Sequence, residues 1–164
     1  MNSKKLFIWG FLFVSVIGSL LHFVYEWSGN NSIVRLFTPW NESTWEHMKL
    51  LFFPMLVLVL FLFFKLPEQS PIPVALSIGT LVGLALIPIL FYTYTGVLGF
   101  SVMAIDIAIF YISVLGAFLI GWFLKDNREL ANRRGLLLTC LVILAILFFI
   151  FSYYPPGIGL LSYF

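Results

Sequence analysis

Residues 50–64 read LLFFPMLVLVLFLFF, a run of fifteen residues without a charged or polar side chain. Together with residues 44–49, this run is long enough to cross the roughly 30 Å hydrocarbon core of a bilayer as a helix that rises about 1.5 Å per residue. The run lacks the strict alternation of polar and apolar residues that a membrane barrel strand needs. It therefore predicts a transmembrane helix over Thr44–Phe64.

Four other stretches share this length and composition: Leu6–Trp27, Ile72–Tyr94, Gly99–Leu124 and Leu136–Tyr153. The 164-residue chain is 62% hydrophobic and 10% charged, whereas a soluble domain is about 45–50% apolar and about 25% charged. This composition excludes a soluble enzyme, a nucleic-acid-binding protein and a disordered regulator. We predict an all-α fold, a polytopic membrane bundle of five transmembrane helices that forms one domain over residues 1–164. Its expected partner is the lipid bilayer.

The positive charges predict the orientation of these helices. On one side of a five-span arrangement lie seven of the nine basic residues: Lys4, Lys5, Lys65, Lys125, Arg128, Arg133 and Arg134. The positive-inside rule then places the N-terminus of this multi-pass membrane protein in the cytoplasm and the C-terminus outside. We interpret the first stretch as an uncleaved anchor, because its apolar run is longer than that of a signal peptide. The tail Tyr153–Phe164 is expected to lie along the outer interface.

Small residues and a capping pattern predict local structure. Ser43-Thr44-Trp45-Glu46 has the spacing of a capping box, in which Ser43 accepts from the amide of Glu46 and Glu46 reaches back to the amide of Ser43. Gly79-x-x-x-Gly83 and the stripe of Ser15, Gly18 and Ser19 favour the close approach of neighbouring helices.

Ionisable side chains gather at the outer ends of the first, second and fourth expected helices. His22 and Glu26 are four residues apart and share a helix face, Glu46 and His47 open the second helix, and Asp106 is expected roughly 10 Å inside the fourth. Charged groups inside a membrane are costly, so such a cluster points to a function.

Imidazoles with carboxylates are typical ligands of zinc, manganese and iron. We predict that His22, Glu26 and His47 bind a divalent metal of this kind. Glu46 or Asp106 would supply a fourth ligand or the catalytic general base. Such a pocket, covered by the loop from Ser28 to Ser43, would support hydrolysis or transfer on a lipid or an extracytoplasmic substrate.

Several alternatives remain open. The same residues fit a small proton- or cation-coupled carrier, and the two histidines fit axial ligation of a haem. The chain also fits a non-catalytic subunit that packs against a membrane-protein partner or against a second copy of itself. In a purely structural interpretation, Glu46 caps its helix, Glu42 and Lys49 contact headgroups and water, and Asp106 forms a structural hydrogen bond or pairs with His22 or Lys49.

Two segments carry a resemblance to a known family. They are residues 21–30, LHFVYEWSGN, and residues 41–54, NESTWEHMKLLFFP. Both resemble motifs of a family of small integral membrane proteins of Firmicute bacteria, which is classed as a domain of unknown function. The resemblance implies a bacterial plasma-membrane location and implies no chemistry.

Overall fold

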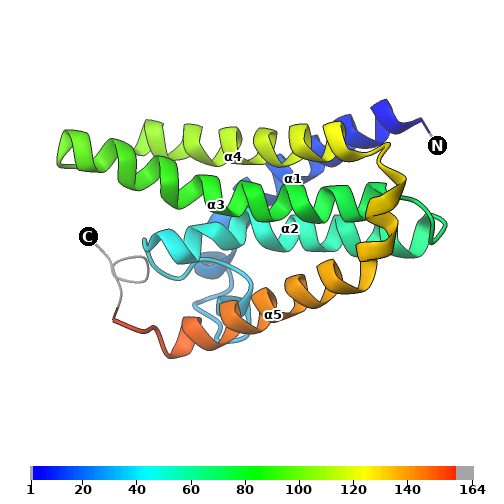
Figure 1. The fold of residues 1–164 in the computed structure, drawn as a ribbon. Coiled ribbons are helices and arrows are strands. Elements are labelled where there is room, and N and C mark those ends of the chain that lie inside the picture. Colours follow the sequence, from blue (N-terminus) through cyan, green and yellow to red (C-terminus); the bar gives the residue numbers. More distant parts are fainter. Residues whose placement is uncertain (1, 158–164) are drawn as a thin grey trace.

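The computed structural model of the protein describes residues 2–157 (Figure 1). The helices of this part of the chain are α1 (Ser3–Trp27), η1 (Val34–Leu36), α2 (Thr44–Lys65), α3 (Ile72–Leu98), α4 (Met103–Leu124), η2 (Arg128–Arg133) and α5 (Arg134–Tyr153). The five α-helices are long and apolar enough to cross a membrane, and residues 2–157 contain no strand. The predicted all-α, five-helix membrane class is therefore confirmed. Most of the tail predicted to lie at the interface, residues 158–164, falls outside the described residues.

The ends of α3 and α4 correct the predicted depth of Asp106. The first of these helices continues to Leu98, where Gly99 adopts the left-handed conformation (φ 81°) that commonly ends a helix. The second begins only at Met103, so Asp106 lies in its first turn instead of roughly 10 Å inside it. A carboxylate is favourable there because the backbone amides of a first turn carry partial positive charge.

The capping box at the start of α2 is only half formed. Ser43 Oγ accepts from the amide of Glu46 at 3.4 Å, as predicted. The amide of Ser43 donates instead to Asn41 Oδ1 at 2.9 Å. The local side chain of Asn41 satisfies this amide, which leaves the Glu46 carboxylate available for contacts elsewhere in the bundle.

The small residues do allow close helix packing. A Cβ atom on Gly79 of α3 would lie 2.1 Å from the carbonyl oxygen of Ala117 in α4, and one on Gly83 would lie 2.9 Å from that of Ser113. A Cβ atom on Gly18 of α1 would lie 2.5 Å from the carbonyl oxygen of Leu50 in α2. These helix pairs approach at glycine because any side chain would force the backbones apart.

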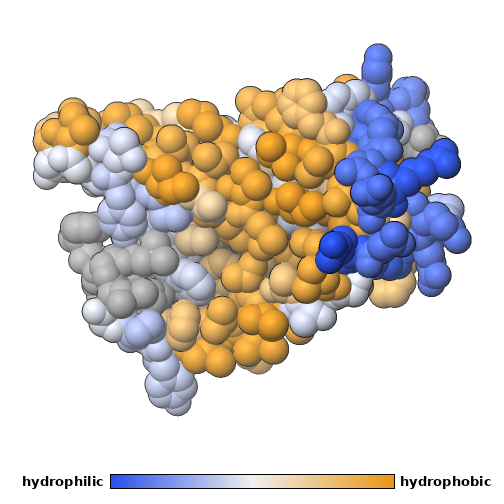
Figure 2. All heavy atoms as spheres, in the orientation of Figure 1, coloured by the Kyte–Doolittle hydropathy of each residue, from blue (hydrophilic) through white to orange (hydrophobic). Residues whose placement is uncertain are grey.

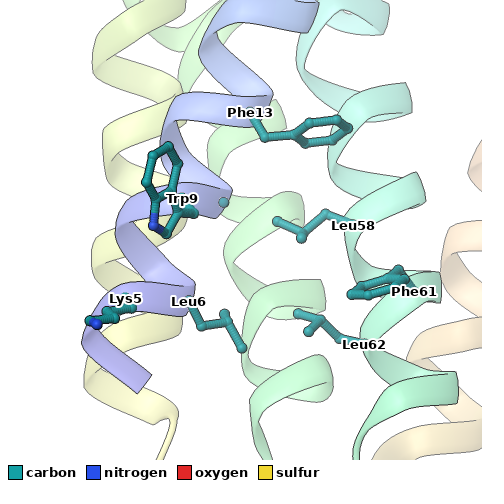
Figure 3. A pocket seen from close by; sticks show the side chains of 8 residues that line it. Lys5, Leu6, Trp9, Phe13, Leu58, Phe61 and Leu62 are labelled. Atoms are coloured by element: carbon teal, nitrogen blue, oxygen red, sulfur yellow. The ribbon is translucent and has the colours of Figure 1, made fainter. Parts of the chain in front are cut away.

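Helix α2 is the most buried of the five, and α5 packs on it through aromatic rings. Phe148 of α5 stacks in tilted geometry against Trp45 and Phe52, with ring centroids 4.6 and 4.9 Å apart. On the opposite side, an apolar groove of about 350 Å³ lies between α1 and α2, and in it Phe13 extends from α1 toward α2 above Leu58 (Figure 3).

The two ends of the bundle differ in charge. The end that contains the start of α1, the α2–α3 connection and η2 is called the basic end. The opposite end is called the histidine end. The basic end carries the seven Lys and Arg residues named above and three acids (Glu68, Asp126 and Glu129), for a formal charge of +4. The histidine end has two basic and four acidic residues, for −2. Figure 2 shows the hydrophilic side chains of the basic end bordering a hydrophobic midsection.

Candidate metal centre

The two histidines meet between α1 and α2. His22 lies a little more than one turn before the end of α1, and His47 lies in the first turn of α2. Their Nε2 atoms are 3.3 Å apart, and both rings are half-buried. The close approach of α1 and α2 at Gly18 and Leu50 brings these helix ends together.

Backbone structure orients the ring of His47. Its Nδ1 lies 3.0 Å from the carbonyl oxygen of Ser43, one helical turn earlier. A carbonyl can only accept, so Nδ1 carries the proton of the neutral ring and Nε2 presents its lone pair toward His22. This is the arrangement in which a metal-binding histidine donates its second N–H to a fixed acceptor.

Glu42 completes the group of ligating side chains. Its Oε2 lies 3.4 Å from His47 Nε2, and one ligand atom from each of His22, Glu42 and His47 falls within 4.8 Å of the others. Within residues 2–157, this is the group of three His, Cys, Asp or Glu side chains positioned to hold a metal. Glu42 is 78% exposed and His47 29%, so the group opens to the surface.

The other predicted site residues are not members of this group. Glu26 is exposed, and it does not belong to the group although it shares a helix face with His22. The carboxylate in the group comes from Glu42, in the loop before α2. Asp106 accepts a hydrogen bond from the Tyr94 hydroxyl, which also accepts from the amide of Val102 at 3.1 Å. Asp106 thus closes the α3–α4 hairpin, and it pairs with neither His22 nor Lys49.

Glu46 faces a different part of the bundle from His47, because adjacent helical residues point about 100° apart. Its carboxylate lies 2.6 Å from Lys49 Nζ, and the two side chains are 2% and 0% exposed. Lys49 was expected among headgroups and water, and its burial corrects that prediction. The i,i+3 spacing of Glu46 and Lys49 places both on one face of α2, but it does not show which helix covers that face.

That covering helix is α5, which contributes Ser152 to the buried pair. The Ser152 hydroxyl accepts from Lys49 Nζ at 2.5 Å. Its one proton is within donating distance of the Phe148 carbonyl oxygen at 2.8 Å and of Glu46 Oε1 at 3.2 Å. Lys49 also donates to the carbonyl oxygens of Arg35 at 2.9 Å and Thr38 at 3.5 Å. The ammonium group thereby joins α2, α5 and the α1–α2 loop in one hydrogen-bonded network.

The same network fixes the loop that carries Glu42. Glu46 Oε2 accepts from the amide of Trp40 at 3.4 Å. Arg35 donates to the carbonyl oxygen of Ser152 at 2.5 Å, and its guanidinium lies 3.6 Å above the Trp40 ring. The loop is therefore held against both α2 and α5 shortly before Glu42, the residue that is grouped with the two histidines.

Comparison with known proteins gives the family of the chain. No curated protein and no solved structure matches it. A family of unknown function, DUF6512, matches residues 1–163. The chain therefore belongs to the family of unknown function DUF6512.

Proposed function

We propose that this membrane protein binds a divalent transition metal, zinc in the first place, through His22, His47 and Glu42. The observation that carries the proposal is the 3.3 Å separation of the two Nε2 atoms. Two ligands of a tetrahedral zinc with bonds of about 2.0–2.1 Å lie about 3.3–3.4 Å apart. The 3.4 Å distance from Glu42 Oε2 to His47 Nε2 fits a second edge of the same tetrahedron.

This geometry favours a single small ion over a haem. Axial ligands on opposite sides of one iron lie about 4 Å apart when each bond is about 2 Å, and a porphyrin plane must fit between their rings. His22 and His47 approach more closely than that, with ring centroids 5.3 Å apart and the rings tilted by 51°. They are placed as neighbouring ligands of one ion.

A site with three protein ligands resembles catalytic zinc sites, which keep one position for water or substrate. An ion held in this way lowers the pKa of its bound water to about 7 and polarises carbonyl or phosphoryl oxygens. The accessible carboxylate of Glu42 leaves the site open to the surface at the histidine end. We propose that it supports hydrolysis or transfer on a lipid or on an extracytoplasmic substrate.

Glu46 would act in this site as a positioning residue. Its carboxylate holds the amide of Trp40, two residues before Glu42, and is itself neutralised by Lys49. This arrangement supports a role in holding the Glu42 loop at the correct distance from the histidines. The proposed location is a bacterial plasma membrane. The distribution of Lys and Arg predicts that the basic end faces the cytoplasm.

The test is metal binding by the detergent-purified protein. The protein is stripped with a chelator and titrated with zinc, and bound zinc is quantified by elemental analysis after desalting. We expect about one zinc per chain, little or none in His22→Ala and His47→Ala, and at least about tenfold weaker binding in Glu42→Gln.

Glu26→Gln is the matched control, because Glu26 is an acid on the same helix face as His22 but lies outside the ligand group. It should bind zinc as the wild type does. Helix content and elution volume show whether each variant is folded. The proposal is wrong if the folded histidine variants retain wild-type zinc, or if the wild type binds none.

A further inference from the structure

A polar pocket lies at the basic end, at the opposite end of the bundle from the histidines. It has a volume of about 600 Å³ and is lined by Glu68, Gln69, Arg128, Ala131, Asn132 and Arg134. The pocket thus lies between the α2–α3 connection and the η2 segment that leads into α5. Two guanidinium groups and two carboxamides give it many more hydrogen-bond donors than the single carboxylate gives it acceptors.

Arg134 is held in place by the end of α2. It donates to the carbonyl oxygen of Phe63 at 2.6 Å, and its guanidinium lies 4.6 Å from the centre of the Phe63 ring. The helical partner of this carbonyl would be the amide of residue 67, which is Pro67 and has no N–H. Arg134 therefore satisfies an otherwise unpaired carbonyl, and its other N–H groups are left in a fixed orientation.

Arg128 lines the same pocket from an exposed position on η2. Its flexible side chain can approach a ligand beside Arg134. Paired guanidinium groups of this kind suit the oxygens of a phosphate, which accept two parallel hydrogen bonds from one arginine. The formal charge of +4 at the basic end draws anions toward this pocket.

The pocket also lies at the depth of lipid headgroups. The apolar run of α2 ends at Lys65, and that of α5 begins directly after Arg134. In a bilayer that covers the hydrophobic midsection, the groups at this border meet the phosphate layer (Figure 2). A phospholipid headgroup is consequently the anion present there at the highest concentration.

We propose that this pocket binds the headgroup of an anionic phospholipid, with Arg128 and Arg134 as ligands of its phosphate. Gln69 and Asn132 would donate to the remaining phosphate or glycerol oxygens. The carboxylate of Glu68 repels the phosphate and therefore weakens the binding of the headgroup. This inference is independent of the proposed metal site, which lies at the other end of the bundle.

The test is lipid binding by the delipidated protein in neutral detergent, measured by native mass spectrometry. Phosphatidylglycerol and phosphatidylcholine are titrated separately, and inorganic phosphate is then added to the phosphatidylglycerol complex as a competitor. We expect phosphatidylglycerol to bind more tightly than phosphatidylcholine, and inorganic phosphate not to compete at equal concentration. Arg128→Gln should weaken phosphatidylglycerol binding by about tenfold, the effect of losing a charge-assisted hydrogen bond.

Arg133→Gln is the matched control for Arg128→Gln. Both variants remove one positive charge from η2, but Arg133 does not line the pocket. Arg133→Gln should therefore lose only the weaker, longer-range attraction. Glu68→Gln should strengthen binding. Equal losses in the two arginine variants, weaker binding in Glu68→Gln, phosphatidylcholine bound as tightly as phosphatidylglycerol, or competition by inorganic phosphate would each overturn the proposal.

Discussion

Lys49 Nζ lies 2.6 Å from Glu46 Oε2 in a part of the bundle where both side chains are removed from the surface. The ammonium group also contacts the Ser152 hydroxyl at 2.5 Å and the carbonyl oxygens of Arg35 at 2.9 Å and Thr38 at 3.5 Å. A charge pair without water is tolerated only when each member is matched and hydrogen-bonded. This pair meets that condition by joining α2, α5 and the loop that leads to Glu42.

Removing one member of the pair should cost far more than removing both. Lys49→Met leaves the Glu46 carboxylate buried without its cation, and we expect a loss of about 3–5 kcal/mol in the free energy of unfolding. The double variant Lys49→Met with Glu46→Leu should recover much of this loss. Unfolding in detergent, followed by circular dichroism, measures both. Additive effects of the two substitutions would show that the pair is not coupled.

Two buried serines should respond differently to substitution by alanine. Ser152→Ala removes the hydroxyl that contacts Lys49 and Glu46, and should destabilise the protein by about 1–3 kcal/mol. The Ser113 hydroxyl is buried and has no hydrogen-bond partner within the described residues. Ser113→Ala should therefore leave stability unchanged or increase it. Equal losses in the two variants would contradict the assigned role of Ser152.

The α3–α4 contact provides a pair of glycines on one helix for comparison. A Cβ atom on Gly79 would meet the Ala117 carbonyl oxygen at 2.1 Å, whereas one on Gly96 would have no atom within 4 Å. Gly79→Ala should lower the unfolding midpoint in detergent strongly, and Gly96→Ala should leave it unchanged or raise it slightly. Equal midpoints for both variants would show that α3 and α4 are not in close contact at Gly79.

Metal binding should depend on pH in a defined direction. Zinc and protons compete for the lone pairs of His22 and His47, so zinc affinity should fall as the pH is lowered through the range in which imidazole becomes protonated. Zinc titrations between pH 5 and pH 8 measure this dependence. Bound zinc that does not respond to pH would indicate carboxylate ligands alone.

The fold could be predicted because lipid imposes a simple constraint on the sequence. Each membrane-spanning helix must be a long apolar run, and all five expected helices appear with ends within four residues of the predicted ones. The largest differences are at Leu98 and Met103, where the conformation of Gly99, and not hydropathy, decides the end of the helix.

The candidate site could be predicted only in part, because helix periodicity shows neither where a loop lies nor which helix packs over a given side chain. The sequence indicated that His22 and His47 would lie at the same end of the bundle, and they do. It suggested Glu26 as their companion, whereas the α1–α2 loop brings Glu42 to them. The burial of Lys49 depends on Ser152, which is 103 residues later in the chain and had no pattern to mark it.

X-ray absorption spectroscopy of the zinc-loaded protein is the sharpest test of a metal centre built on His22 and His47. We predict a four-coordinate zinc with light ligands at about 2.0–2.1 Å and the multiple scattering of two imidazoles, one of which disappears in His22→Ala. A shell of six oxygens without imidazole scattering, or the same spectrum in His22→Ala, would contradict a site built on His22 and His47.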